Sequence, residues 1–209
     1  MSEVMTWWDT LEWHAYEVAY GDPAGTRSRE LATATWQTRI VDLTPSEAVL
    51  WAAIPKTMRQ AIRKGERSWQ IRIGNFDAYQ DVHQQTAQRQ RSDETYRCQR
   101  RWVAMGCAVV TTAHSSVEAR VGACYVIRYQ GWAYYASGPS LLPHVMPALI
   151  WRAMRACQAL GDHLFEVGWQ DHAEDAKGQS IERFKSRFGG RNVPANGVEY
   201  LRGSTTTLR

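Results

Sequence analysis

The chain has 209 residues, of which 44% are hydrophobic and 22% are charged, and its formal net charge is +4. This length suits one large domain or two small ones, and the balance of apolar and charged residues excludes a disordered chain. Its longest apolar runs, such as 102–110, fall well below the roughly 20 residues of a membrane span. Glu3 and Asp9 stand where a secretory signal would be basic. We therefore expect a soluble cytoplasmic protein that does not associate with membranes.

Turn residues and hydrophobic periodicity predict the elements of the first half of the chain. Thr44 is expected to cap a helix whose first position is Pro45, with Glu47 as the capping-box partner. Pro55 must end that helix, because proline lacks the N–H that the next turn needs. We expect this helix to turn inward Val49, Leu50, Trp51 and Ile54. The predicted strands are 13–20, 35–43 and 69–73, and the helices that follow Pro55 are 56–67, one capped by Asn75, and 92–105.

The second half alternates between strands and helices. Strands at 121–128 and 132–137 are joined tightly at Gln130-Gly131, which predicts a hairpin. Further predicted elements are a strand at 107–113, helices at 144–160 and 178–188, and strands at 163–167 and 197–201. This order predicts the α+β class, with a mixed, largely antiparallel central sheet that carries helices on both faces.

Basic residues gather in three runs, at 56–72, 89–101 and 183–191. Such runs in an otherwise acidic chain favour an anionic partner, although each run taken alone is more often a solvated helix face. Only four residues of the chain are Lys, and one of them, Lys185, lies in the last run.

The cysteines and histidines show no zinc spacing and no disulfide framework. We expect four reduced thiols and no metal site. The cysteines are Cys98, Cys107, Cys124 and Cys157.

The stretch 184–190, which reads F-K-S-R-F-G-G, follows a strand that ends in Glu166-Val167-Gly168. It resembles the C-terminal signature of FemABX-type transferases, which are built on the acyl-CoA N-acyltransferase (GNAT) fold. Weaker matches in the same order lie at 42–44, 58–64, 131–138 and 149–151. The resemblance implies a single GNAT-like transferase domain at 34–209, preceded by an N-terminal extension at 1–33 with an aromatic cluster.

The resemblance implies transfer of an acyl or aminoacyl group to an amine. The donor would be a co-substrate rather than a resident cofactor: aminoacyl-tRNA, acyl-CoA or a carrier thioester. The acceptor would be an amine on a small molecule, a peptide or a modified nucleic acid. Such reactions pass through a tetrahedral oxyanion. The site must supply a hydrogen-bond donor that stabilises this negative charge, and a route for the amine proton. By resemblance, Lys185 is that hydrogen-bond donor. The alternative is that Lys185 is a surface lysine on an amphipathic helix.

Two features depart from the family. FemABX proteins normally carry two copies of the fold, and this chain has room for one. The region that would hold the pyrophosphate of CoA, 140–147, has no glycine pair and contains Pro143 and Pro147, which remove backbone donors. This departure favours a donor other than CoA, although Gly138 and Ser140 leave CoA open.

The remaining candidate site residues come from pattern alone. Glu166 is a carboxylate between apolar strand neighbours, which suggests either a base for the acceptor amine or a partner for an arginine. Tyr134 and Tyr135 point to opposite faces of one strand, so one packs in the core and the other lines the cleft. We take Tyr135 as a third catalytic candidate, Tyr134 and Phe184 as substrate-binding candidates, and Ser137 as one more, since it lies where the strand ends.

Four basic or titratable residues complete the substrate-binding candidates. Arg59 and Arg63 share a helix face at i, i+4 spacing and suit a phosphate or a carboxylate. His83 and Arg89 lie on or near one helix, where His83 is either a ligand contact or a core histidine. No residue has an evident activating base that would make it a covalent nucleophile, so we expect direct transfer within a ternary complex.

A rival hypothesis is a nucleic-acid-binding module that combines the basic runs with some of the ten tryptophans. A third is a degenerate fold that serves as an interaction partner. Seven tryptophans fall about one to each predicted element, which favours core anchors over a stacking platform. They are Trp36, Trp51, Trp69, Trp102, Trp132, Trp151 and Trp169.

Overall fold

The structure, a computed structural model, describes residues 31–87, 91–169 and 176–200. The chain divides into one compact unit of residues 38–193 and another of residues 1–37 with 194–209, and the first unit is the one described below. The strand predicted at 13–20, the N-terminal aromatic cluster and Arg89 lie outside the described residues. The domain boundary after residue 33 stays a prediction.

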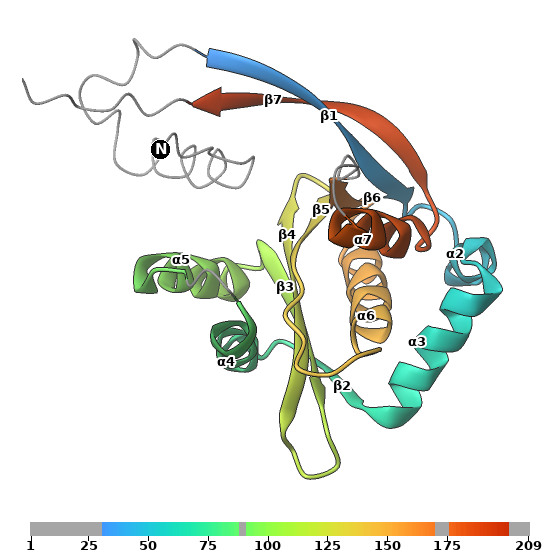
Figure 1. Ribbon diagram of the computed structural model, residues 1–209, viewed down its shortest axis with the longest axis vertical. Coiled ribbons are helices and arrows are strands. Elements are labelled where there is room, and N and C mark those ends of the chain that lie inside the picture. The colour runs from blue at the N-terminus through green and yellow to red at the C-terminus, as the bar shows by residue number, and fades with distance from the viewer. Residues whose placement is uncertain (1–30, 88–90, 170–175, 201–209) are drawn as a thin grey trace, which may run out of the picture. The chain divides into compact units, whose positions relative to one another are not determined.

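The described elements form a seven-stranded sheet in the order β2-β3-β4-β5-β6-β1-β7 (Figure 1). Pairing is antiparallel between β2 and β3, β3 and β4, β4 and β5, and β1 and β6, whereas β5 and β6 run parallel. The predicted α+β class with a largely antiparallel sheet is confirmed. The elements are β1 (Leu31–Asp42), α2 (Glu47–Ala53), α3 (Lys56–Ser68), β2 (Gln70–Ile73), α4 (Phe76–Thr86), α5 (Asp93–Ala104), β3 (Ala108–His114), β4 (Arg120–Tyr129), β5 (Trp132–Ser137), α6 (Met146–Ala159), β6 (Leu164–Trp169), α7 (Ala176–Ser186) and β7 (Arg191–Tyr200).

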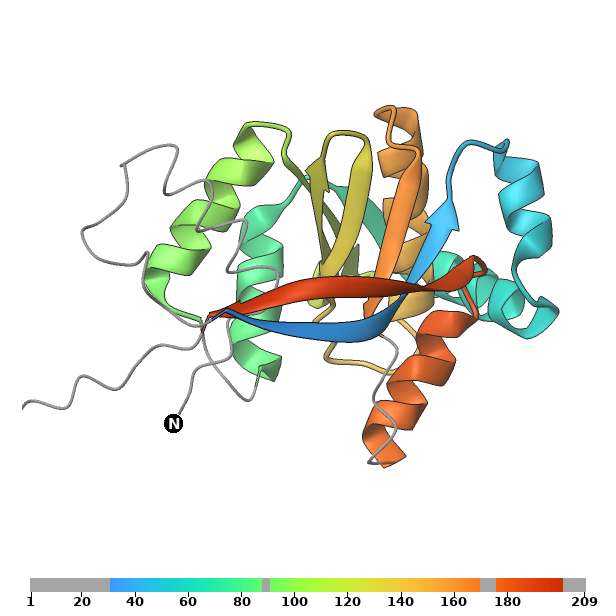
Figure 2. The same ribbon diagram turned by 90° about the horizontal axis from the view of Figure 1, so that it is seen from above.

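Helices cover both faces of the sheet, as predicted. Figure 2 shows α4 and α5 on one side of the strands and α2, α3 and α6 on the other. The main core lies on the α6 side, where Leu149 and Ile150 of α6 pack with Phe165 of β6. On the α4 side, Tyr79 stacks on Tyr125 of β4 with ring centroids 5.1 Å apart. Each face of the sheet is therefore closed by its own apolar layer.

The parallel pairing between β5 and β6 is short, so the two strands are hydrogen-bonded over only part of their length. The hairpin into β5 turns at Gln130 and Gly131, both with positive φ (48° and 79°), as the sequence predicts. Parallel pairing between β5 and β6 then covers three positions and ends at Tyr134 opposite Glu166. Both strands continue beyond this point. Past the last paired position, their backbones no longer form a parallel ladder.

The start of α2 differs from the prediction. The N-cap is Ser46 and the helix begins at Glu47. Both the backbone N–H and the hydroxyl of Thr44 bind Asp42 Oδ1, at 2.9 and 2.7 Å, so Thr44 closes a turn instead of capping the helix. The inward orientation expected for Val49 is also wrong, because its side chain is 56% exposed.

Two other helix boundaries agree with the sequence. Pro55 separates α2 from α3 and is the N-cap of α3. Asn75 caps α4 by accepting a hydrogen bond of 2.9 Å from the backbone N–H of Ala78. None of the helices in the described ranges is long and apolar enough to cross a membrane.

The tryptophans whose burial the structure describes are buried to different degrees. Trp151 is 2% exposed and belongs to the main core. Trp51 and Trp69 are partly buried and pack against that core, which agrees with their prediction as core anchors. Trp102 and Trp132 are also partly buried but do not belong to the main core.

Candidate functional site

Lys185 reaches the place where β5 and β6 lose their pairing. A methyl group placed on Gly168 of β6 would lie 3.3 Å from Lys185 Nζ and 3.6 Å from Cε2 of Tyr134. The ammonium therefore lies against the backbone of β6, beside the Tyr134 ring. Gly168 has a φ of +88°, a conformation that L side chains rarely adopt, and its missing side chain leaves this approach open.

Glu166 provides the carboxylate of this site. It alternates with Phe165 and Val167, which are fully buried in the main core, so its side chain lies on the other face of β6. Thr38 of β1 donates a hydrogen bond of 2.6 Å to Glu166 Oε1. The indole N–H of Trp132 also lowers the pKa of Glu166, although its geometry falls short of a full hydrogen bond.

Burial shifts the pKa values of Lys185 and Glu166 in the directions that favour the neutral form of each group. Desolvation lowers the pKa of Lys185 to about 8, and attraction to Glu166 offsets part of that decrease. Desolvation likewise raises the pKa of Glu166, while Thr38, Trp132 and Lys185 oppose the rise. A partly desolvated ammonium and carboxylate are suited to stabilise developing charge and to accept a proton.

The F-K-S-R-F-G-G stretch positions Lys185 for simple packing reasons. Phe184 and Phe188 meet edge to face at 5.4 Å, and Phe188 is 1% exposed in the main core. Gly190 passes so close to β1 that a Cβ would lie 2.2 Å from the carbonyl oxygen of Ile40. Arg39 donates hydrogen bonds to the carbonyls of both glycines, at 2.6 and 3.0 Å. The end of α7 is thus anchored on β1, with Lys185 between two core phenylalanines.

The structure places Tyr134, and not Tyr135, beside Lys185. Tyr135 packs against the main core, and its hydroxyl lies under Gly138 and Met146 at the start of α6. Burial raises the pKa of Tyr135 far above its usual range. Because neighbouring strand residues point to opposite faces, only one of the two tyrosines can reach the Lys185 site. The structure thus does not bring the predicted Tyr135 to Lys185, and it is Tyr134 that lies there.

The two arginines of α3 make other contacts. Arg59 donates to the carbonyls of Ala52 and Ile54, both at 3.0 Å, and so caps the end of α2. Arg63 lies over the Trp51 ring, with its guanidinium carbon 5.3 Å from the ring centroid. The described contacts of neither arginine involve Lys185 or Glu166.

His83 and Ser137 belong to the aromatic layer under α4. His83 is 7% exposed and its Nδ1 lies 2.8 Å from the hydroxyl of Tyr96. Desolvation, with a smaller contribution from Arg91, lowers the pKa of His83 to about 4, so the ring is neutral at pH 7. Desolvation raises the pKa of Tyr79, and Ser137, which lies close to the Tyr79 hydroxyl, opposes part of that rise. His83 has the environment of a core histidine.

Three residues of the site are not among the site residues predicted from the sequence. Thr38 and Trp132 flank Glu166, and Gly168 makes room for Lys185. Thr38 and Trp132 alternate with neighbours like any strand residue, so no local pattern marks them. The one available signal is Gly168, a glycine inside a predicted strand, which commonly indicates a close approach of other groups.

The loop before α6 keeps some of its backbone groups occupied. The N–H of Leu141 donates to Val121 O at 2.9 Å, and the carbonyl of Pro139 accepts from Ala123 N at 2.9 Å. The hydroxyl of Ser140 donates to the carbonyl of Leu142 at 2.5 Å. Two hydrogen-bond donors of this loop, the N–H of Leu141 and the hydroxyl of Ser140, are therefore already used.

Two of the three basic runs come together in space. The guanidinium of Arg187, at the end of α7, donates a hydrogen bond of 2.8 Å to the hydroxyl of Thr57 at the start of α3. The run on α5 lies on the other face of the sheet and is partly neutralised, since Arg97 and Arg100 pair with Glu94 and Asp77. The α3 and α7 runs thus meet near the end of the helix that carries Lys185.

No family model matches this sequence, and no curated protein matches it either. Solved structures do match. The chain is similar to a crystal structure of FemX, with 10% sequence identity and a TM-score of 0.61, covering 79% of this chain and 61% of that chain. It is also similar to L-PGS from Bacillus licheniformis, with 12% identity and a TM-score of 0.56, covering 84% of this chain and 63% of that chain. The chain thus spans less than two thirds of either structure.

These similarities confirm the predicted fold: the described chain has a FemX-like architecture. At 10–12% sequence identity these similarities show only how the backbone is arranged. The chemistry must therefore be argued from the residues of this chain.

Proposed function

We propose that this protein is an N-acyltransferase that moves an acyl or aminoacyl group from an activated donor to an amine. The observation that carries the proposal is the cluster of Lys185, Glu166 and Tyr134 at the point where β5 and β6 cease to pair. It combines a cation, a carboxylate of raised pKa and a phenol on a fold shared with FemX. These are the groups that acyl transfer to an amine needs.

In the proposed reaction, the neutral acceptor amine attacks the carbonyl carbon of the donor and forms a C–N bond. Lys185 donates a hydrogen bond to the oxyanion that develops, and Glu166 accepts the proton that the amine loses. The tetrahedral intermediate then collapses, the C–O or C–S bond of the donor breaks, and the leaving oxygen or sulfur takes up the proton that Glu166 accepted from the amine. Tyr134 is placed to orient the reacting groups. Transfer is direct, because the step needs no covalent acyl-enzyme.

For the donor we favour an acyl group carried on RNA, with acyl-CoA as the alternative. The joined basic runs of α3 and α7 support a polyanionic donor, since they bring exposed arginines and lysines to the helix that carries Lys185. In the loop before α6 the N–H of Leu141 is already used, and Pro143 there and Pro147 at the start of α6 have none, which argues against the usual pyrophosphate grip of CoA. Simple nucleic-acid binding without transfer is the second candidate function, supported by the same basic surface.

Mass spectrometry and RNA analysis of protein purified directly from cells will separate these donors. Co-purifying aminoacyl-tRNA supports the RNA-borne donor, and co-purifying CoA supports the alternative. Transfer to a panel of amines is then measured with the donor found. Lys185→Ala should lower turnover at least about tenfold, since removing one oxyanion donor commonly costs more than that. Undiminished turnover in a folded Lys185→Ala variant would refute the assignment, and RNA binding without transfer would favour the second candidate.

A further inference from the structure

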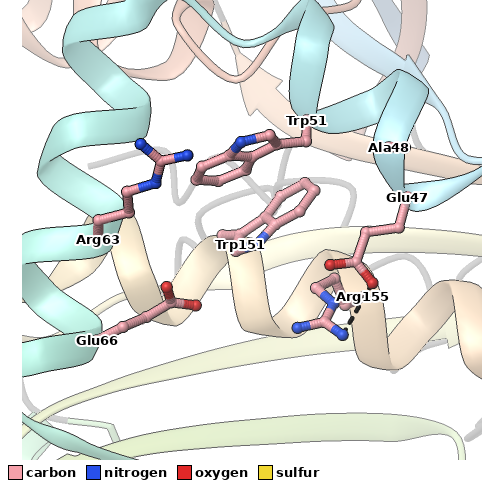
Figure 3. Close-up of a pocket in the computed structure, with 7 residues that line it drawn as sticks. All are labelled: Glu47, Ala48, Trp51, Arg63, Glu66, Trp151 and Arg155. Carbon is pink, nitrogen blue, oxygen red and sulfur yellow. Dashed lines mark ion pairs between the residues drawn. The ribbon is translucent and has the colours of Figure 1, made fainter.

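A hollow on the outer side of α6 is not used by the proposed reaction. It measures about 490 Å³ and lies between α2, α3 and α6 (Figure 3). Trp51 and Trp151 form its aromatic wall, with ring centroids 5.2 Å apart and planes inclined by 49°. None of its lining residues belongs to the Lys185 cluster. The volume falls within the roughly 300–1,000 Å³ that is usual for small-molecule sites.

Charges of both signs surround this hollow. Glu47 and Arg155 line one side and are already paired, with Oε2 of Glu47 2.8 Å from Nη2 of Arg155. Arg63 and Glu66 line the other side and stand three residues apart on α3. Among the described residues, neither of these two forms an ion pair, and Figure 3 shows their charged ends apart. The rim thus carries one ion pair, Glu47 with Arg155, and one open pair, by which we mean Arg63 and Glu66, whose opposite charges do not contact each other.

Arg63 of the open pair contacts the aromatic wall. The guanidinium carbon of Arg63 lies over the Trp51 ring, 5.3 Å from the centroid, and the charge is attracted to the ring face. This attraction does not use the N–H donors of the guanidinium, which suit a carboxylate. Glu66 offers a carboxylate on the same side of the hollow, which suits an ammonium.

The balance of charge selects among ligands. A simple anion would meet Glu47 and Glu66 as well as the arginines, and a simple cation would meet Arg63 and Arg155. A ligand that carries a negative and a positive group close together can place the negative group on Arg63 and the positive group on Glu66, so that no like charges meet. An apolar or aromatic group on the same ligand would then cover the indoles.

We propose that this hollow binds a free α-amino acid as its zwitterion. The ligand carboxylate binds the guanidinium of Arg63, its ammonium binds Glu66, and an apolar side chain packs against Trp51 and Trp151. The site is separate from the transfer site, and its existence does not depend on the proposed function.

Calorimetric titration of the full-length protein with L-phenylalanine tests this proposal. We expect saturable binding at millimolar concentration. N-acetyl-L-phenylalanine, which lacks the ammonium, and L-phenylalanine amide, which lacks the carboxylate, should each bind at least about tenfold more weakly, because each leaves a charged partner unmatched. Equal binding of the blocked derivatives overturns the zwitterion. Tighter binding of the dipeptide glycyl-phenylalanine overturns the single amino acid in favour of a peptide.

Substitutions locate the binding on this hollow. Glu66→Gln and Arg63→Gln should each weaken phenylalanine binding about tenfold, because each removes one charge-assisted contact. Arg67→Gln, an exposed base of the same helix that does not line the hollow, is the matched control and should bind like the parent protein. Lys185→Ala should also leave the binding unchanged, which separates this site from the transfer site. Absence of saturable binding in the parent protein, or unchanged binding in both hollow variants, overturns the proposal.

Discussion

Lys185 shows how a single residue acquires chemistry from its surroundings. Exposed lysines have a pKa near 10.5 and stay protonated throughout the physiological range. Here burial against the backbone of β6, beside the Tyr134 ring, lowers the pKa to about 8, and Glu166 keeps it from falling further. The side chain is therefore charged at pH 7, yet it loses its proton within reach of mildly alkaline conditions.

This shift predicts the alkaline side of the pH profile. A lowered pKa means that the ammonium is present below about pH 8 and is lost as the pH rises through that value. If Lys185 stabilises the oxyanion, kcat/KM should fall above about pH 8 in the parent protein. Lys185→Arg keeps its charge at higher pH, so the decline should move upward even where the maximal rate is lower. A rate that rises through pH 8 would instead identify Lys185 as a base.

Gly168 allows a second prediction at this scale. Gly168→Ala introduces a side chain at a φ of +88° and places a methyl group 3.3 Å from Lys185 Nζ. The backbone strain should lower stability by roughly 1 kcal/mol. The crowding should lower turnover by a larger factor than the loss of folded protein explains. Urea unfolding and turnover measured on the same preparation separate the two effects, and unchanged turnover would show that the Lys185 ammonium tolerates displacement.

At the scale of elements, the crossing of α3 and α6 decides how closely the helices approach. Gly65 lies in the last turn of α3 and faces Ala148 of α6, where a Cβ on Gly65 would be 2.7 Å from that of Ala148. A glycine inside a helix ordinarily costs about 1 kcal/mol relative to alanine. Here that cost is offset by a contact that no larger residue permits.

Gly65→Ala should therefore destabilise the protein in spite of its better helix propensity. Overpacking of a tight contact costs about 1–3 kcal/mol, against a propensity gain of about 1 kcal/mol. The net loss should be visible as a lower midpoint of urea unfolding. Gly65→Ala combined with Ala148→Gly restores the space and should recover part of the loss. A Gly65→Ala variant more stable than the parent would show that α3 and α6 can move apart freely.

For the whole molecule, the fold joins basic runs that lie far apart in sequence. Arg187 of α7 contacts Thr57 of α3, so the exposed bases of both helices belong to one region, whereas the α5 run is partly paired on the other face of the sheet. If the donor is polyanionic, as proposed, this arrangement predicts that it binds on the α3 and α7 side.

Binding of tRNA should therefore depend on salt and on this region. Each phosphate contact contributes about 0.9 to the slope of log K against log salt on duplex nucleic acid, so losing one lowers the slope by about 1. Arg183→Gln and Arg67→Gln, both exposed on these helices, should each weaken binding and reduce the slope. Arg97→Gln on α5, where Arg97 pairs with Glu94, is the control. Filter binding at several salt concentrations gives the slope, and equal effects of all three variants would refute a dedicated surface.

The sequence by itself determined the elements and the class of the fold, because these follow from local signals. Hydrophobic periodicity, Pro55, Asn75 and the Gln130-Gly131 turn act within a few residues of their own position. The resemblance in the 184–190 stretch pointed to the architecture that the similarity to FemX confirms. Lys185 and Glu166 also stand out in the sequence alone, as a rare lysine and a carboxylate in an apolar strand.

The tertiary structure alone decided which residues gather around those two. Strand alternation shows that Tyr134 and Tyr135 differ in face, yet it does not say which face carries Lys185. That choice depends on where α7 returns to the sheet, which is fixed by Gly190 against Ile40. The same holds for Thr38, which contacts Glu166 across 128 residues of sequence. Contacts of this kind depend on long-range packing, and packing leaves no local pattern in the sequence.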